Sequence, residues 1–201
     1  TRRSSDLVAS SAVVSLTQTT ILSNTARNGG GVSNFGTLTF EDSTISNNSA
    51  LFIGGGIYND GTLTMINTTL SDNTATAGAG GGIYNRDGTL TINNSTLSGN
   101  STGDDGGGVY NFAGTLTFSN STLSGNSAGL FGGGIFNSSN ALTLSNSTLS
   151  GNSATSSGGG IYNTGTATLY NTIIANSPNG GDCAGGSSVT ADAFNLDSDG
   201  S

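Results

Sequence analysis

The sequence predicts an all-β fold, a single right-handed parallel β-helix (β-solenoid) of about six to seven coils with three short strands in each coil. Three observations support this fold class. A motif of about 26 residues recurs along the chain, apolar and polar residues alternate within it as in a strand, and glycine interrupts each window that could form a helix. With 34 glycines and one proline among 201 residues, the composition is also that of a repeat protein.

Glycine triplets followed by isoleucine or valine mark the start of each repeat. Successive copies are 25, 26, 26, 26 and 26 residues apart, and they begin at Gly29, Gly54, Gly80, Gly106, Gly132 and Gly158. Each copy reads approximately GGGIYN, a short turn, TLTI, a short link, STLSGN and a variable tail. We expect a leader with a partial coil over residues 1–28, six repeats over 29–183, and a truncated C-terminal flap over 184–201.

The TLTI segments predict how each strand is oriented. Leu90 and Ile92 should point to one face and Thr89 and Thr91 to the other, because side chains alternate along a strand. A strand of this length cannot form a core alone. Stacking on the copy one repeat later would produce a continuous apolar column, as in a solenoid.

Asparagine and glycine mark the expected corners of the coil. Stacked asparagine amides can hydrogen-bond to their copies about 4.8 Å above and below, and glycine triplets can supply positive φ and close packing between coils. We therefore expect an asparagine ladder at each corner. The three series are Asn34, Asn59, Asn85, Asn111, Asn137 and Asn163; Asn67, Asn94, Asn120, Asn146 and Asn171; and Asn48, Asn73, Asn100, Asn126 and Asn152.

Charge and composition exclude several classes of partner. A formal net charge of −8 with four arginines and no lysine leaves no basic surface for nucleic acid. No run of about 18 apolar residues is present, so we expect no membrane span in these residues. Because the chain starts at Thr1 and residues 1–6 do not fit the repeat, we expect a fragment of a longer protein.

The acidic residues are too scattered for the paired carboxylates of a glycosidase, so we predict a non-enzymatic protein without a cofactor. Asp60, Arg86 and Asp87 should lie together at one corner of adjacent coils. We interpret them as a solvated turn with a counter-ion. The alternative is a polysaccharide lyase or hydrolase, because many β-helices have these activities.

An aromatic residue follows the glycine triplet and its aliphatic neighbour in five repeats. Strand alternation places these rings on the outside, where a stripe can bind a glycan or a protein, or simply stack from coil to coil. The candidate binding residues are Tyr58, Tyr84, Tyr110, Phe136 and Tyr162.

The outward threonines of the TLT segments form a second array. Such ranks resemble the ice-binding faces of β-helical antifreeze proteins, although threonine is also simply a favourable residue in strands. Ala141 replaces the first threonine in one coil, which leaves Thr143 alone there. The other members of this alternative ice-binding face are Thr37, Thr39, Thr62, Thr64, Thr89, Thr91, Thr115, Thr117, Thr166 and Thr168.

Asn195, Asp197 and Asp199, followed by Gly200, resemble the first half of a calcium loop. The closing acidic ligand is missing from these residues. A polar turn is the simpler interpretation, and a calcium site is the alternative.

Two sets of motifs resemble known families. LSGN (residues 97–100) and GGGI (residues 80–83) are similar to the FxxN and GGA(I/L/V) repeats of polymorphic outer membrane proteins. That resemblance implies a β-helical passenger on the bacterial outer membrane with a role in adhesion. NTIIANSPNGGDCAGG (residues 171–186) and FNLDSDGS (residues 194–201) resemble the end of β-helical domains in secreted, surface-anchored bacterial proteins. This resemblance implies that Cys183 pairs with a cysteine beyond Ser201.

Taken together, these expectations favour an adhesin-like module of a secreted or cell-surface bacterial protein that binds a glycan or a surface protein or serves as a structural spacer. The open ends of a solenoid also permit end-to-end self-association. The lyase or hydrolase and the ice-binding protein are the alternatives.

Overall fold

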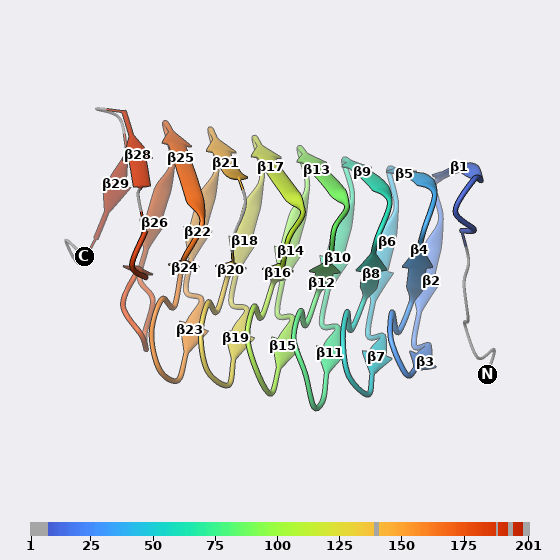
Figure 1. Ribbon diagram of the computed structural model, residues 1–201, viewed down its shortest axis with the longest axis horizontal. Coiled ribbons are helices and arrows are strands. Elements are labelled where there is room, and N and C mark those ends of the chain that lie inside the picture. Colours follow the sequence, from blue (N-terminus) through green and yellow to red (C-terminus); the bar gives the residue numbers. More distant parts are fainter. Residues whose placement is uncertain (1–7, 139–140, 188, 193–194, 199–201) are drawn as a thin grey trace.

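The computed structural model describes residues 8–138, 141–187, 189–192 and 195–198. The chain winds into about seven coils stacked along one axis, with β1 (Val13–Thr17) at one end of the rod and β28 (Val189–Ala191) and β29 (Leu196–Asp197) at the other (Figure 1). All regular elements in these ranges are strands, and every strand pairs in parallel with its counterpart in the neighbouring coil. The predicted all-β parallel solenoid is confirmed. No helix in the described ranges is long and apolar enough to cross a membrane.

Two of the four sheets come from the first half of each repeat. Sheet A holds the strands after the glycine triplets: β4 (Val32–Asn34), β8 (Ile57–Asn59), β12 (Ile83–Asn85), β16 (Val109–Asn111), β20 (Ile135–Asn137), β24 (Ile161–Asn163) and β27 (Cys183–Ala184). Sheet B holds the TLT strands: β1 (Val13–Thr17), β5 (Thr37–Glu41), β9 (Thr62–Ile66), β13 (Thr89–Asn93), β17 (Thr115–Ser119), β21 (Ala141–Ser145), β25 (Thr166–Tyr170) and β28 (Val189–Ala191).

The other two sheets come from the second half. Sheet C holds β2 (Thr20–Leu22), β6 (Thr44–Ser46), β10 (Thr69–Ser71), β14 (Thr96–Ser98), β18 (Thr122–Ser124), β22 (Thr148–Ser150), β26 (Ile173–Ala175) and β29 (Leu196–Asp197). Sheet D holds β3 (Thr25–Ala26), β7 (Ser49–Ala50), β11 (Thr74–Ala75), β15 (Ser101–Thr102), β19 (Ser127–Ala128) and β23 (Ser153–Ala154).

A regular coil therefore has four strands, and the predicted number of three was wrong. The additional strands are those of sheet D, which are two residues long. Two residues cannot show the alternation by which a strand is recognised in a sequence. Their pairing with the coils above and below, as between Ser127 and Ser101, is what makes them strands.

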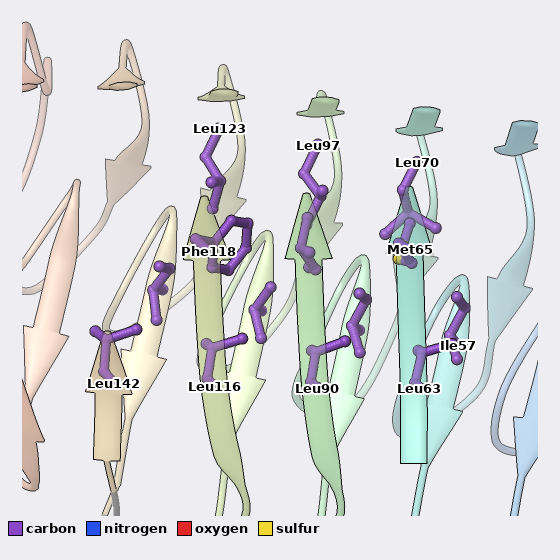
Figure 2. Packing of buried hydrophobic residues seen from close by; sticks show 14 of the residues in the cluster. Ile57, Leu63, Met65, Leu70, Leu90, Leu97, Leu116, Phe118, Leu123 and Leu142 are labelled. Carbon is purple, nitrogen blue, oxygen red and sulfur yellow. The ribbon is translucent and has the colours of Figure 1, made fainter. Parts of the chain in front are cut away.

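The core consists of apolar columns, as the alternation predicted. Leu63, Leu90, Leu116 and Leu142 of sheet B lie in register and are completely or almost completely buried. Figure 2 shows this row beside a second row from sheet C, with Leu70, Leu97 and Leu123. Burial of one leucine side chain stabilises the fold by about 1.5–3 kcal/mol, so the columns provide the main favourable contribution.

Two of the three asparagine series form the predicted buried ladders. In the first, the Asn85 amide donates to Asn111 Oδ1 at 2.8 Å. In the second, both the backbone N–H and the amide of Asn100 donate to Asn126 Oδ1 at 3.0 Å, and the amide also reaches the Leu70 carbonyl. Each asparagine thus satisfies backbone groups in neighbouring coils that are removed from water.

The third series, Asn67, Asn94, Asn120, Asn146 and Asn171, differs from this prediction. These residues are exposed and have φ between 46° and 50°, so they shape the turn from sheet B to sheet C rather than form a buried ladder. Part of the predicted stacking is nevertheless present, because the exposed Asn171 amide donates to Asn146 Oδ1 at 2.8 Å. Asparagine tolerates this left-handed conformation better than most residues.

The residue after each of these asparagines forms a ladder that the sequence analysis missed. The Thr68 N–H donates to Ser95 Oγ at 3.0 Å, and the Ser95 N–H donates to Ser121 Oγ at 3.1 Å. Each hydroxyl also donates to the carbonyl two residues earlier, as from Ser95 to Asn93 at 2.7 Å. Ser43, which follows Asp42, belongs to the same ladder because its N–H donates to Thr68 Oγ1 at 3.4 Å. We call this series, from Ser43 to Thr172, the Ser/Thr column.

The glycine triplets have two physical roles. Gly106 has a φ of 71°, a conformation that glycine adopts without strain. Gly107 is needed for space, because a Cβ there would lie 2.4 Å from the Gly133 oxygen and 2.6 Å from the Ser127 carbonyl carbon. Both predicted reasons for the triplets are confirmed.

Candidate functional site

The five aromatic residues predicted to form a stripe lie on the outer face of sheet A and stack from coil to coil. Ring centroids of successive members are 4.9–5.9 Å apart, and their planes differ by 6–16°. Strands β8 to β24 place one ring in each coil because the preceding aliphatic residue and the following asparagine point inward. Parallel register then brings each ring over the next.

Three further rings join this stripe and were not predicted. Phe35 is tilted against Tyr58 at 5.6 Å, Phe112 stacks on Tyr110 at 6.3 Å, and Phe131 is tilted against Tyr162 at 4.6 Å. Phe35 and Phe112 each follow directly after the asparagine that ends a strand of sheet A, and this spacing is the signal that could have revealed them. We call the eight rings together the aromatic band.

Stacking determines which parts of the band meet solvent. Tyr58 and Phe136 are only 6% and 9% exposed, because their faces are covered by neighbouring rings. Tyr84, Tyr110 and Tyr162 are half-buried, and Phe112 is 44% exposed. The band therefore presents ring edges, tyrosine hydroxyls and the Phe112 side chain.

Burial also affects the acidity of the tyrosine hydroxyls. Burial, with a contribution from the neighbouring Tyr84, raises the pKa of Tyr110 to about 12. Burial and the neighbouring Tyr58 raise the pKa of Tyr84 above its usual value. Both hydroxyls are thus protonated at neutral pH and can donate hydrogen bonds to a partner.

A small polar cluster lies at the edge of the band. Arg86 Nη1 is 3.6 Å from an Asp60 carboxylate oxygen, Arg86 Nε is 3.4 Å from Asp87, and Nη1 donates to the Tyr58 hydroxyl at 3.4 Å. The structure therefore brings together the three residues that the sequence placed at one corner. Two carboxylates paired with one exposed guanidinium fit the interpretation of a solvated turn.

A further pair of acidic residues, Asp104 and Asp105, lies in the loop between sheets D and A. Asp105 accepts a hydrogen bond from the Phe131 N–H at 3.1 Å, which ties this loop to the next coil. Burial raises the pKa of Asp105, while the hydrogen bond from Phe131 opposes this effect. Asp104 precedes it in the same loop.

Of the three residues of the calcium candidate, the structure describes the side chain of Asn195, which is hydrogen-bonded within the fold. Asn195 Oδ1 accepts the Thr172 N–H at 2.8 Å, and the amide donates to the Leu169 carbonyl and to Asp192. Asn195 thus continues the Ser/Thr column. Asp199 and the side chain of Asp197 lie outside the described residues. In the described part of the chain, no group of three or more His, Cys, Asp or Glu residues is placed to hold a metal ion.

The outward threonines of sheet B lie in two ranks. Thr89 pairs with Thr62 and Thr115, and Thr91 pairs with Thr64 and Thr117, so each rank runs along the rod in register. The first rank is exposed and the second is half-buried. The predicted alignment of the threonines is confirmed, with Ala141 at the expected gap.

The family of this chain follows from its sequence and agrees with the solenoid. The chain matches the family described as the right-handed β-helix region over residues 7–194, and it therefore belongs to that family. No significant match was found among curated proteins or among solved structures. Because the fold hosts several functions, function has to be inferred from the surface. The closer resemblance to polymorphic outer membrane proteins stays a prediction.

Proposed function

We propose that this chain is a non-enzymatic, adhesin-like module of a secreted or cell-surface bacterial protein, in which a stiff rod carries a binding face. The aromatic band is the observation that supports this proposal most. It runs without a break from Phe35, directly after β4, through the five successive strands of sheet A that carry Tyr58 to Tyr162. Aromatic residues are enriched in interfaces because they combine a large apolar area with a polar group.

The geometry of the band favours a protein partner over a glycan. Sugars stack on the faces of aromatic rings, but most faces here are covered by the adjacent ring. Phe112 is the most exposed ring in the band and offers the best position for stacking. A protein surface can contact ring edges and accept hydrogen bonds from Tyr84 and Tyr110.

The rod itself supports the second part of the proposal, a spacer. Each coil hydrogen-bonds to its neighbours through four parallel sheets and two buried asparagine ladders. A solenoid built in this way holds its ends at a fixed separation. A binding face on such a rod would be presented at a fixed distance from the anchor.

The proposal is tested with the wild-type chain and two band variants on arrays of cell-surface proteins and of glycans. Phe112→Ala removes an exposed ring, and the double variant Tyr84→Phe with Tyr110→Phe removes two hydroxyls while keeping the stack. Thr122→Ala on sheet C is the matched control. We expect binding to weaken about tenfold or more in the band variants, as for interface hot spots, and to be unchanged in the control.

Two results would contradict the proposal. One is a wild-type chain that binds no member of either array. The other is binding that the band variants and the control retain equally, which would assign the contact to a different face.

A further inference from the structure

The outer face of sheet B carries two ranks of side chains that are composed almost entirely of threonine. The six strands from β5 to β25 have twelve outward positions in the two ranks, of which eleven are threonine and one is Ala141. Ser15 and Thr190 continue the second rank at the two ends, because they pair with Thr39 and Thr168. The same hydroxyl group therefore recurs in every coil of the sheet.

The register turns this composition into a two-dimensional grid. Parallel strands repeat the hydroxyls about 4.8 Å apart along the rod, and alternate residues of one strand repeat them about 6.7 Å apart across it. Thr89 lies beside Thr115 without a shift, as Thr62 lies beside Thr89. A partner that contacts every position needs a regular lattice of its own.

The hydroxyls of this grid are not used within the protein. Throughout the described ranges, no hydrogen bond joins any of the eleven threonine hydroxyls to another protein group. By contrast, the buried Ser95 hydroxyl both accepts and donates, and Thr74 and Ser101 of sheet D bond to each other at 3.1 Å. The grid hydroxyls are therefore available to solvent or to a ligand.

The chemistry of the face limits which kind of lattice the partner can have. The two ranks contain no charged and no aromatic residue, and Glu41 and Tyr170 lie at the neighbouring outward position of the first and last of the six strands. Charge would be needed for an ionic surface, and exposed rings for a crystalline polysaccharide. The rings are instead gathered on sheet A. An uncharged lattice that hydrogen-bonds at every point is ordered water.

We infer that the outer face of sheet B binds the surface of ice crystals, with the two threonine ranks as the contact residues. The hydroxyl groups replace water positions in the lattice, while the threonine methyl groups restrict the orientation of water between them. This inference goes beyond the proposed function, because it uses a different sheet and requires neither a protein nor a glycan.

The test measures ice-crystal shape and thermal hysteresis with the full 201-residue chain. We expect faceted crystals and a hysteresis gap for the wild type. The double variant Thr91→Lys with Thr117→Lys should reduce the gap about tenfold, since bulky side chains at the centre hold the lattice away from neighbouring coils. The matched control is Thr96→Lys with Thr122→Lys, which places the same change on sheet C in the same two coils. Circular dichroism and thermal melting check that both variants fold.

A gain of activity provides a second measurement. Ala141→Thr fills the gap in the first rank and should increase the hysteresis. Phe112→Ala, which tests the aromatic band, should leave it unchanged, so the two hypotheses fail separately.

Rounded crystals without a hysteresis gap for the wild type would overturn the inference. Equal loss of activity in the sheet B variant and its sheet C control would overturn it as well. Binding of the wild-type chain to crystalline cellulose without any effect on ice would also overturn the inference, because it would assign the grid to a polysaccharide lattice.

Discussion

In the regular coils, an asparagine buried at the turn from sheet C to sheet D accepts the backbone N–H of the coil before it, as Asn152 does from Asn126 at 3.0 Å. At the C-terminal end this place is taken by Ser177, two residues after the Ala175 that pairs with Ser150. The Ser177 N–H donates instead to the buried Asp182 at 2.9 Å. Asp182 thus accepts the buried backbone N–H that an asparagine accepts in the regular coils, but from a different position in the chain.

The Ser/Thr column shows the same contrast. Between regular coils a hydroxyl accepts the N–H, as Ser95 does from Thr68, whereas at the end the longer Asn195 amide accepts it from Thr172. Asp182 also accepts from both the N–H and the hydroxyl of Ser198, which follows β29. An interior coil relies on an identical neighbour, while the C-terminal coil relies on side chains that reach in from loops.

This difference predicts that damage to an interior ladder affects the whole rod. In Asn100→Ala, the Asn73 N–H and the Asn73 amide lose their common acceptor at 3.0 and 2.9 Å. Because these buried groups then lack partners, we expect the free energy of unfolding to fall by about 3–5 kcal/mol. Urea unfolding monitored by circular dichroism measures this loss.

Asn94→Ala is the control for that variant. Asn94 is exposed and has a φ of 49°, so its replacement should cost only about 1 kcal/mol from the strained backbone. If the two variants were equally stable, the buried ladder would not be the source of stability that the geometry indicates.

Damage at the C-terminal end should remain local. Asp182→Ala removes the acceptor of the Ser177 N–H and of the Ser198 N–H and hydroxyl, which should cost about 1.5–3 kcal/mol in that coil. Hydrogen exchange should therefore accelerate at Ser177 and Ser198 and stay unchanged in sheet B at Thr91. Loss of protection throughout the rod would show that the end coil is coupled to the interior as strongly as the regular coils are to each other.

The aromatic band makes the stability of the middle of the rod depend on pH. The pKa of Tyr110 is raised from 10.0 to about 12, so its contribution is complete below pH 10 and is lost as the pH rises toward 12. In that interval the unfolded chain releases the proton while the folded chain retains it. We expect a loss of about 1 kcal/mol, reduced by solvent screening of the half-buried hydroxyl.

Urea unfolding measured below and above pH 10 gives the slope of the free energy of unfolding against pH. Tyr110→Phe provides the comparison. The variant should show a weaker slope, with a remainder due to Tyr84, whose pKa is also raised. An absorbance titration in which Tyr110 ionises like free tyrosine would contradict the assigned burial.

The smallest effect is expected at the polar edge of the band. Arg86→Ala breaks two exposed ion pairs, with Asp60 at 3.6 Å and with Asp87 at 3.4 Å. Exposed ion pairs add little because water and salt screen them, so the urea midpoint should not change measurably. A clear destabilisation would instead indicate that Arg86 contributes through its contact with Tyr58.

The features that could be predicted are those encoded by residues close together in the chain. The period, the inward leucines, the outward threonines and the glycine triplets follow from alternation and spacing alone. The stripe from Tyr58 to Tyr162 and the two buried asparagine ladders follow from the same pattern, because residues one period apart are stacked by the fold.

The tertiary structure alone decided features that strand alternation does not encode, because their residues lie in very short strands, turns or loops. It defined the two-residue strands of sheet D, the Ser/Thr column, and the contact of Phe131 with the aromatic band. It also placed Asp182 and Asn195 at the end of ladders built by other residues. A repeat can be recognised from a sequence because each copy makes the same contacts, whereas Asp182 and Asn195 find their partners only when the fold has brought dissimilar residues within hydrogen-bond distance.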